Sequence, residues 1–432
     1  MPKRLDAQSA NFETEFKMVL SAKRESDVDV NQSVADILAD VAKNGDQAVV
    51  DYTNRFDRQS LTVDQLAIGH DEWDKATGQV DADVIDALEL AATRIEKFHE
   101  RQKPGGEDYI DEVGVRLGYR WTPVAAAGLY VPGGLAAYPS SVLMNAIPAR
   151  VAGVPRLVMV VPTPDGHLNP MVLAAAKIAG VSEIYRIGGA QAIGALAYGT
   201  DTIKPVDKIV GPGNAYVAAA KRQVFGTVGI DMIAGPSEIL VVADRQNDPS
   251  WIAADLLSQA EHDRSAQSIL ITDDAVFATR VEAAVESQLK SLPRESIARP
   301  SWSDYGVVIV VKDIKTDAPA LIDRLAPEHL ELAIDDPDGL ANSIRNAGAI
   351  FLGRYTPEAI GDYVAGPNHV LPTARSARFT SGLGVLDFMK RTTFIGCNAE
   401  SLGKIGPAAV RLADGEGLQA HGRSVSIRLN SV

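Results

Sequence analysis

Cysteine is nearly absent from this sequence: its 432 residues include only Cys397, so an intrachain disulfide cannot form. Long apolar runs are missing too, because glycine, proline or charge interrupts each stretch before it reaches the roughly 18 residues that span a bilayer. The N-terminal segment lacks the apolar core of a signal peptide. These absences predict a soluble, cytoplasmic protein.

Positive charge is also scarce, with 42 Lys and Arg against 56 Asp and Glu, a net charge of −14. Nucleic acids and anionic membranes require a basic surface, so neither is expected as a partner. A small molecule is the expected ligand. The chain is 46% hydrophobic and long enough to bury two or three cores, which predicts several domains.

Secondary-structure patterns change after a Pro/Gly-rich break at 101–108. Before the break the pattern is helical, and after it short apolar runs alternate with helical stretches, as in parallel sheets covered by helices. Asn169-Pro170 and Asp248-Pro249 are typical helix starts, and Gly180 is a typical helix end. The expected strands are Leu157–Val161, Ile184–Ile187, Lys208–Val210, Ile239–Val242, Ser268–Thr272, Val307–Val311, Leu330–Ile334 and Ala349–Leu352.

The end of the chain, from about Lys390, differs from the rest. We expect a helix over Ser401–Leu412 and a strand over Ser424–Asn430, which together are too small to fold alone. This tail carries ionisable residues but little core, so it should pack on another domain or on a partner subunit. The glycine-dense part, 128–236, is interpreted as an α/β unit inserted into another.

Neither the GxGxxG fingerprint of dinucleotide-binding folds nor the Walker sequence GxxxxGK[ST] is present. Three other glycine loops occur, at 128–134, 188–194 and 211–214, and two of them follow an expected strand and open a helix. Phosphate is commonly held at such helix starts. Ordinary strand-to-helix turns explain the glycines equally well.

Four of the seven histidines lie beside acids or amides, in the groups Gln259/His262, Glu328/His329, Asp362/His369 and Glu416/His421. Imidazole and carboxylate ligands suit zinc, and a histidine outside the metal shell can transfer protons near neutral pH. A polar helix end or a turn-stabilising aspartate is the alternative for individual groups. Cys397 has no neighbouring acid or base, so we expect a packed thiol rather than a nucleophile that traps an aldehyde.

Long segments of the sequence closely resemble histidinol dehydrogenases, in order and over nearly the whole chain beyond about residue 25. They are GLYVPGGLAAYPSSVLMNAIPARVAGV (128–154), IGGAQAIGALAYGT (187–200), KIVGPGNAYVAAAKR (208–222), DMIAGPSEILVVAD (231–244), DLLSQAEHD (255–263), APEHLEL (326–332), TPEAIGDYVAGPNHVLPT (356–373), SGLGVLDFMKR (381–391) and EGLQAH (416–421).

The resemblance implies oxidation of L-histidinol to L-histidine, through L-histidinaldehyde, by a homodimer with shared active sites that uses one zinc per subunit and two NAD. Manganese or cobalt would also suit such ligands. The residues that it implies are, for zinc, Gln259, His262, Asp362 and the partner-supplied His421; for NAD, Tyr130, Gln191 and Asn214; for substrate, the zinc ligands with Ser237, His329, His369 and Glu416; and for acid/base catalysis, Glu328 and His329.

We therefore expect an α/β fold of two incomplete Rossmann-like doubly wound domains, with a helical N-terminal segment and a small C-terminal dimerisation tail. The expected divisions are a helical arm at 1–24, a discontinuous first domain at 25–127 and 237–385, an inserted NAD-contacting domain at 128–236, and a tail at 386–432. The alternatives are a related zinc/NAD dehydrogenase for another small polar alcohol, a zinc hydrolase without dinucleotide, and a non-enzymatic binding protein.

Overall fold

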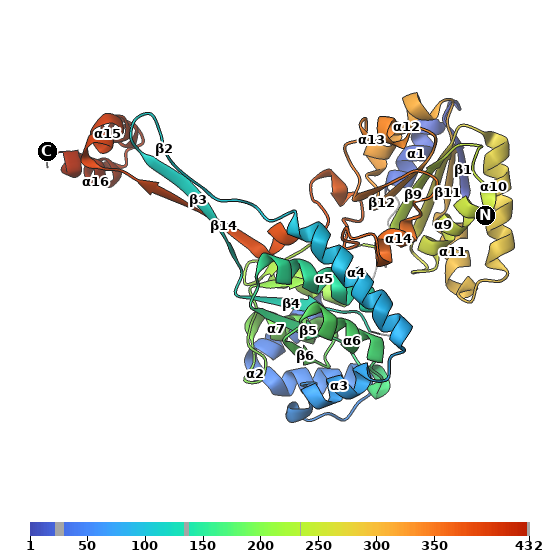
Figure 1. Ribbon diagram of the computed structural model, residues 1–432, viewed down its shortest axis with the longest axis horizontal. Helices are drawn as coiled ribbons and strands as arrows, with labels where there is room; N and C mark the ends of the chain where they lie inside the picture. Colours follow the sequence, from blue (N-terminus) through green and yellow to red (C-terminus); the bar gives the residue numbers. More distant parts are fainter. Residues whose placement is uncertain (22–29, 134–137, 234, 430–432) are drawn as a thin grey trace.

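The structure, a computed structural model, describes residues 1–21, 30–133, 138–233 and 235–429. Figure 1 shows two α/β bodies and a long arm that projects from one of them and carries the C-terminal helices. Among the described residues, no helix is both long and apolar enough to cross a membrane. The predicted α/β class is confirmed.

The first body, called the six-stranded body, is built on a fully parallel sheet in the order β1-β11-β10-β9-β12-β13. Every residue of its central strands is buried, because helices cover both faces. Its strands are β1 (Lys3–Asp6), β9 (Glu238–Ala243), β10 (Gln267–Thr272), β11 (Val307–Val310), β12 (His329–Ala333) and β13 (Ala349–Leu352). Helices α1 (Phe12–Ser21), α12 (Ile314–Leu325) and α13 (Pro337–Ala341) cover one face, and α9 (Pro249–Ala260), α10 (Ala275–Leu289) and α11 (Glu295–Tyr305) cover the other. The short α14 (Glu358–Tyr363) follows β13.

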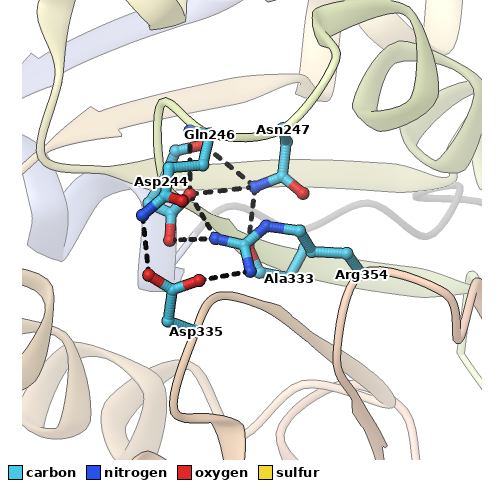
Figure 2. Close-up of polar contacts among 6 residues, drawn as sticks. All are labelled: Asp244, Gln246, Asn247, Ala333, Asp335 and Arg354. Carbon is cyan, nitrogen blue, oxygen red and sulfur yellow. Dashed lines mark hydrogen bonds and ion pairs between the residues drawn. The ribbon is translucent and has the colours of Figure 1, made fainter.

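An ion-pair network joins the C-terminal ends of β9, β12 and β13 (Figure 2). The guanidinium of Arg354 donates to Asp244 at 2.6 and 2.8 Å and to Asp335 at 2.7 Å. Asn247 donates to the carbonyl of Ala333 at 2.7 Å. Ligands in open parallel sheets often bind at this edge, where the strand order reverses. Here protein side chains occupy it, and these residues do not line the large cleft described below.

The second body, called the five-stranded body, has a parallel sheet in the order β6-β5-β4-β7-β8. Its strands are β4 (Ala126–Tyr130), β5 (Arg156–Val160), β6 (Glu183–Tyr185), β7 (Lys208–Val210) and β8 (Gly229–Ile230). Helices α3 (His70–Thr77), α4 (Ala82–Glu100), α5 (Pro139–Ala152) and α6 (Pro170–Ala179) cover one face, and α2 (Asn31–Asp57), α7 (Gly189–Tyr198) and α8 (Ala215–Val224) cover the other. The order reverses between β4 and β7.

The predicted starts of α6 and α9 are confirmed. The Asn169 side chain accepts a hydrogen bond from Met171 N at the start of α6, and Gly180 ends that helix in the left-handed region. Asp248 caps α9 in the same way. Each cap satisfies a backbone N–H that has no partner within the helix. The short 3-10 helices are η1 (Val63–Gln65), η2 (Pro164–Gly166), η3 (Ser376–Arg378) and η4 (Val385–Phe388).

The arm consists of an antiparallel sheet in the order β14-β3-β2, followed by a helical hairpin. Its elements are β2 (Glu107–Ile110), β3 (Arg116–Pro123), β14 (Met389–Gly396), α15 (Ala399–Gly415) and α16 (Gln419–Leu429). The expected strand over 424–430 is wrong, because α16 continues to Leu429; Asn430 lies outside the described residues. Val425 and Leu429, four residues apart, both pack at Gly406 of α15, a spacing that a helix provides.

The chain is divided differently from the sequence-based prediction. Residues 3–6 form β1 of the six-stranded sheet, so 1–24 is no purely helical arm; residues 22–24 lie outside the description. Helices α2 to α4, which were assigned with 237–385, pack on the five-stranded body, where Leu38 and Val41 of α2 meet Gly194 of α7. Residues 107–123 contribute to the arm. Amphipathic helices indicate that a face is buried, but not against which sheet.

Candidate active site

One cleft of about 1150 Å³ is lined by residues from both bodies. The five-stranded sheet contributes loops at its C-terminal edge. The six-stranded sheet contributes the N-terminal ends of β9 and β12, where Ser237, Glu328 and His329 lie, together with the end of α9 and α14. This arrangement places several sequence-predicted residues around a single space.

Three of the predicted zinc ligands line this cleft. Gln259 lies in the last turn of α9 and is 1% exposed, and its Oε1 has no hydrogen-bond partner within the part of the chain that the structure describes. His262 follows that helix, and its backbone N–H donates to the backbone carbonyl of Gln259 at 3.2 Å. Asp362 faces them from α14. A buried amide oxygen without a partner is costly unless an ion or ligand meets it, so the amide, imidazole and carboxylate donors fit a zinc ion.

Asp362 is set among histidines. His369 Nδ1 lies 3.1 Å from the backbone carbonyl oxygen of Asp362 and 3.5 Å from the side-chain Oδ1 of the same residue. Burial opposes ionisation of Asp362, but the His369 hydrogen bond and the nearby His329 and His262 outweigh it and lower the pKa of Asp362 to about 2. Asp362 is therefore a carboxylate at neutral pH, as a metal ligand must be.

The predicted acid/base pair lies at the start of β12. His329 Nδ1 is 2.9 Å from the Glu238 carbonyl, which assigns the proton to Nδ1 and leaves the lone pair on Nε2. Burial lowers the pKa of His329, so neutral imidazole is favoured. Glu328 Oε2 accepts from Glu238 N at 2.9 Å, and burial raises the pKa of Glu328 well above its usual value.

Two of the three predicted dinucleotide residues, Tyr130 and Asn214, lie at the reversal point of the five-stranded sheet, and Gln191 lies at the start of α7, which follows the edge strand β6. Tyr130 ends β4, and its hydroxyl accepts a hydrogen bond from Gly189 N at 3.1 Å, while burial raises its pKa to about 12. Gln191 is 1% exposed, and none of the residues that the structure describes forms a hydrogen bond with its Oε1. Asn214 caps α8 through its Oδ1. All three line the cleft, at the sheet edge where parallel α/β folds usually bind ligands.

A sequence model described as histidinol dehydrogenase matches residues 20–429. The chain belongs to the histidinol dehydrogenase family. A relative named histidinol dehydrogenase from Rhodospirillum rubrum is 69% identical over 430 residues, 100% of this chain and 99% of the relative. One of the same name from Ruegeria pomeroyi is 64% identical over 430 residues, with 100% and 99% covered. The crystal structure of histidinol dehydrogenase from Elizabethkingia anophelis matches with a TM-score of 0.94 and 38% identity, covering 100% of this chain and 98% of that one.

Membership in this family confirms the predicted resemblance and the enzyme class, an oxidoreductase. Two predicted site residues nevertheless lie far from the cleft of their own chain. Glu416 follows α15 and His421 lies in α16, both exposed at the far end of the arm. The other predicted substrate contacts, Ser237 and His369, line the cleft, where His369 Nε2 is 3.5 Å from Ser141 Oγ.

The sequence interpretation missed Glu358. Its side chain is buried, its Oε1 lies 3.5 Å from His329 Nε2, and its Oε2 accepts from Ser258 Oγ at 3.2 Å. Burial and the adjacent Asp362 raise the pKa of Glu358 to about 9. Ligand atoms of His329, Glu358 and Asp362 lie within 4.8 Å of one another, a second possible metal grouping. The i, i+4 spacing of the two acids was the available signal.

Cys397 is exposed on the arm, next to β14, so the prediction of a packed thiol is wrong. None of the β14 residues is buried, and the loop after β14 is not covered by either body. The thiol is not among the residues that line the cleft. Cys397 therefore does not reach the cleft of its own chain.

Proposed function

We propose that the protein oxidises L-histidinol to L-histidine through L-histidinaldehyde, with one zinc ion per subunit and two NAD, in the final steps of histidine biosynthesis. One observation carries the proposal: the zinc-type donors, the buried imidazole of His329 and the loops with Tyr130, Gln191 and Asn214 line the same cleft. A hydrolase would leave those loops without a role.

Gln259, His262 and Asp362 are the side chains of this chain that would hold zinc, with the partner's His421 as the fourth ligand. When bound, zinc supplies a positive centre that orients the amine and imidazole of histidinol. Gln259 contributes an amide oxygen that is already buried and that no described residue meets with a hydrogen bond. His369 keeps Asp362 directed into the cleft through its contact at 3.5 Å.

In the first oxidation His329 acts as the general base. Its Nε2 has no hydrogen-bond partner among the described residues, and it carries a lone pair because Nδ1 is bound to the Glu238 carbonyl. Nε2 accepts the hydroxyl proton of histidinol while the carbon-bound hydrogen leaves as hydride to NAD. The products of this step are the aldehyde, NADH and one proton held on His329.

In the second oxidation Glu328 acts on water. Its raised pKa makes the carboxylate, once ionised, a stronger base than an exposed glutamate. Glu328 removes a proton from water as the oxygen adds to the aldehyde carbon, and the proton held on His329 passes to the aldehyde oxygen. The hydrate then loses hydride to a second NAD and a hydroxyl proton to His329, which leaves the carboxylic acid. Keeping the aldehyde in one cleft throughout limits its escape.

The shared site explains the exposed tail. Within their own chain, Glu416 and His421 are exposed on an arm held away from both bodies. Leu412, Leu418 and Ile427 of the same arm are also exposed, an apolar surface suited to a second copy. We propose a homodimer in which each arm delivers Glu416 and His421 to the partner's cleft.

A substrate panel tests the identity of the alcohol. Metal-replete protein with NAD is assayed by NADH absorbance against L-histidinol, imidazole-ethanol and other small amino alcohols. L-histidinol should have the highest kcat/KM, because both its amine and its imidazole meet the donor set. A higher value for an alcohol that lacks the imidazole would favour a related dehydrogenase of different specificity.

A further inference from the structure

A buried ion pair lies beside the dinucleotide loops. Lys221 on α8 pairs with Asp231, which follows β8, and their side chains are 3% and 1% exposed. Both residues line the cleft, although no role in binding or catalysis has been assigned to either above. An ion pair so well hidden from water demands a reason, because desolvating two charges costs as much as or more than their attraction returns.

The pair holds both polar backbone groups of one glycine. Lys221 Nζ donates to the Gly211 carbonyl at 2.9 Å, and Asp231 Oδ2 accepts from Gly211 N at 2.8 Å. Gly211 has φ +109°, and a Cβ there would lie 2.1 Å from the Tyr130 carbonyl oxygen. The ion pair therefore holds Gly211 against the end of β4, at a position where only glycine fits.

This contact determines where the next residues lie. Pro212, Gly213 and Asn214 connect Gly211 to α8, and Asn214 caps that helix by accepting from Tyr216 N and Val217 N. Lys221, two turns along α8, returns to Gly211, so the loop and the helix start form a closed unit. The unit places Asn214 and the N-terminus of α8 at a set position relative to Tyr130.

We propose that the Lys221–Asp231 pair positions the Gly211–Asn214 loop for dinucleotide binding; this inference rests on the NAD-dependent function proposed above. Lys221 is a positioning residue, since its ammonium is buried and already meets two acceptors instead of facing the ligand. Because the pair is neutral overall, it can order the backbone near a pyrophosphate without adding a net charge. Desolvating the two charges is unfavourable, but the resulting loop is already ordered before NAD binds, which favours binding.

The test separates NAD binding from general stability. In Lys221→Met/Asp231→Leu both charges and both bonds to Gly211 are lost, so no unpaired charge remains in the interior. We expect the KM for NAD to rise by about tenfold or more, with the KM for histidinol within about twofold of wild type. Calorimetric titration with NAD alone should give the same loss of affinity. Asp231→Asn retains an acceptor for Gly211 N but leaves the Lys221 charge buried without its counter-ion, so it should also raise the KM for NAD.

The matched control is Arg156→Met/Glu183→Gln. This ion pair joins the starts of β5 and β6, at the opposite edge of the same sheet. The Arg156→Met/Glu183→Gln variant should have a lower melting temperature than wild type, with the KM for NAD and the KM for histidinol unchanged. The inference is overturned if the Lys221/Asp231 variants keep wild-type affinity for NAD, or if both KM values rise together in variants and control. Failure of the proposed function is distinct, because wild-type protein itself would then form no NADH.

Discussion

His329 Nε2 and Glu358 Oε1 lie 3.5 Å apart, and neither atom has a hydrogen-bond partner among the described residues. Both side chains are almost fully buried, so both atoms are costly unless something meets them. The hydroxyl of the substrate is the group that the proposed chemistry would place there.

Substitution of Glu358 should change kcat rather than the KM for NAD. We expect Glu358→Ala to lower kcat by about tenfold to a hundredfold, because it removes a group that confines His329 and Asp362. The KM for NAD should stay within about twofold, since Glu358 is remote from the Gly211–Asn214 loop. Glu358→Gln, which keeps the size and hydrogen-bonding capacity, is the control. Equal losses of kcat in both variants would show that charge, not position, is what His329 requires.

Substitutions of His329 and of Cys397 should have very different effects on kcat. His329→Asn removes the general base and should lower kcat by roughly a hundredfold or more. Cys397→Ser should keep turnover within about twofold of wild type, because the thiol is exposed on the arm outside the cleft. Initial rates of NADH formation measure both. An inactive Cys397→Ser enzyme with normal folding would require a covalent thiohemiacetal and contradict the His329 mechanism.

Subunit complementation tests the origin of the fourth ligand. His262→Asn and His421→Asn should each be inactive as homodimers. After the two are mixed, unfolded and refolded together, about half of the dimers are hybrids, and each hybrid has one intact site, so about a quarter of wild-type activity should return. If His421 served its own chain, every site in the mixture would lack a ligand and no activity would return. Size-exclusion chromatography checks that dimers form.

Stability should fall toward alkaline pH because of Glu331. Burial, with Asp255 beside it, raises the pKa of Glu331 to about 9, against 4.5 for a free glutamate. Between these values the folded state binds more protons than the unfolded state, so the free energy of unfolding falls as pH rises, by at most about 1.4 kcal/mol per pH unit for one group. Urea unfolding at pH 6 and 9 should show a smaller fall for Glu331→Gln. An equal fall in both proteins would contradict the assignment.

The central strands and several site residues were predictable from sequence because their signals are local. Apolar runs such as 239–242 and 268–272 lie in buried parallel strands, and the Asn169-Pro170 start depends on one side chain and its own helix. Local sequence motifs also indicated Gln259, His262 and His329 as site residues, and all three line one cleft in the structure.

The arm and the domain division were not predictable in this way. Strand β3 pairs with β14 across some 270 residues of chain, for example Tyr119 with Thr393, and its half-buried residues of mixed polarity show no strong alternation. The six-stranded sheet takes β1 from the N-terminus, which no local pattern indicates. Glu358 was missed because its importance comes from burial against His329, a contact that a linear motif does not reveal.

The number of NADH molecules formed per histidine tests the central claim most directly. Limiting L-histidinol is incubated with metal-replete protein and excess NAD, and NADH, histidine and free aldehyde are measured at completion. The proposed mechanism predicts two NADH per histidine with no aldehyde released. One NADH with free histidinaldehyde, or no NADH at all, would contradict it.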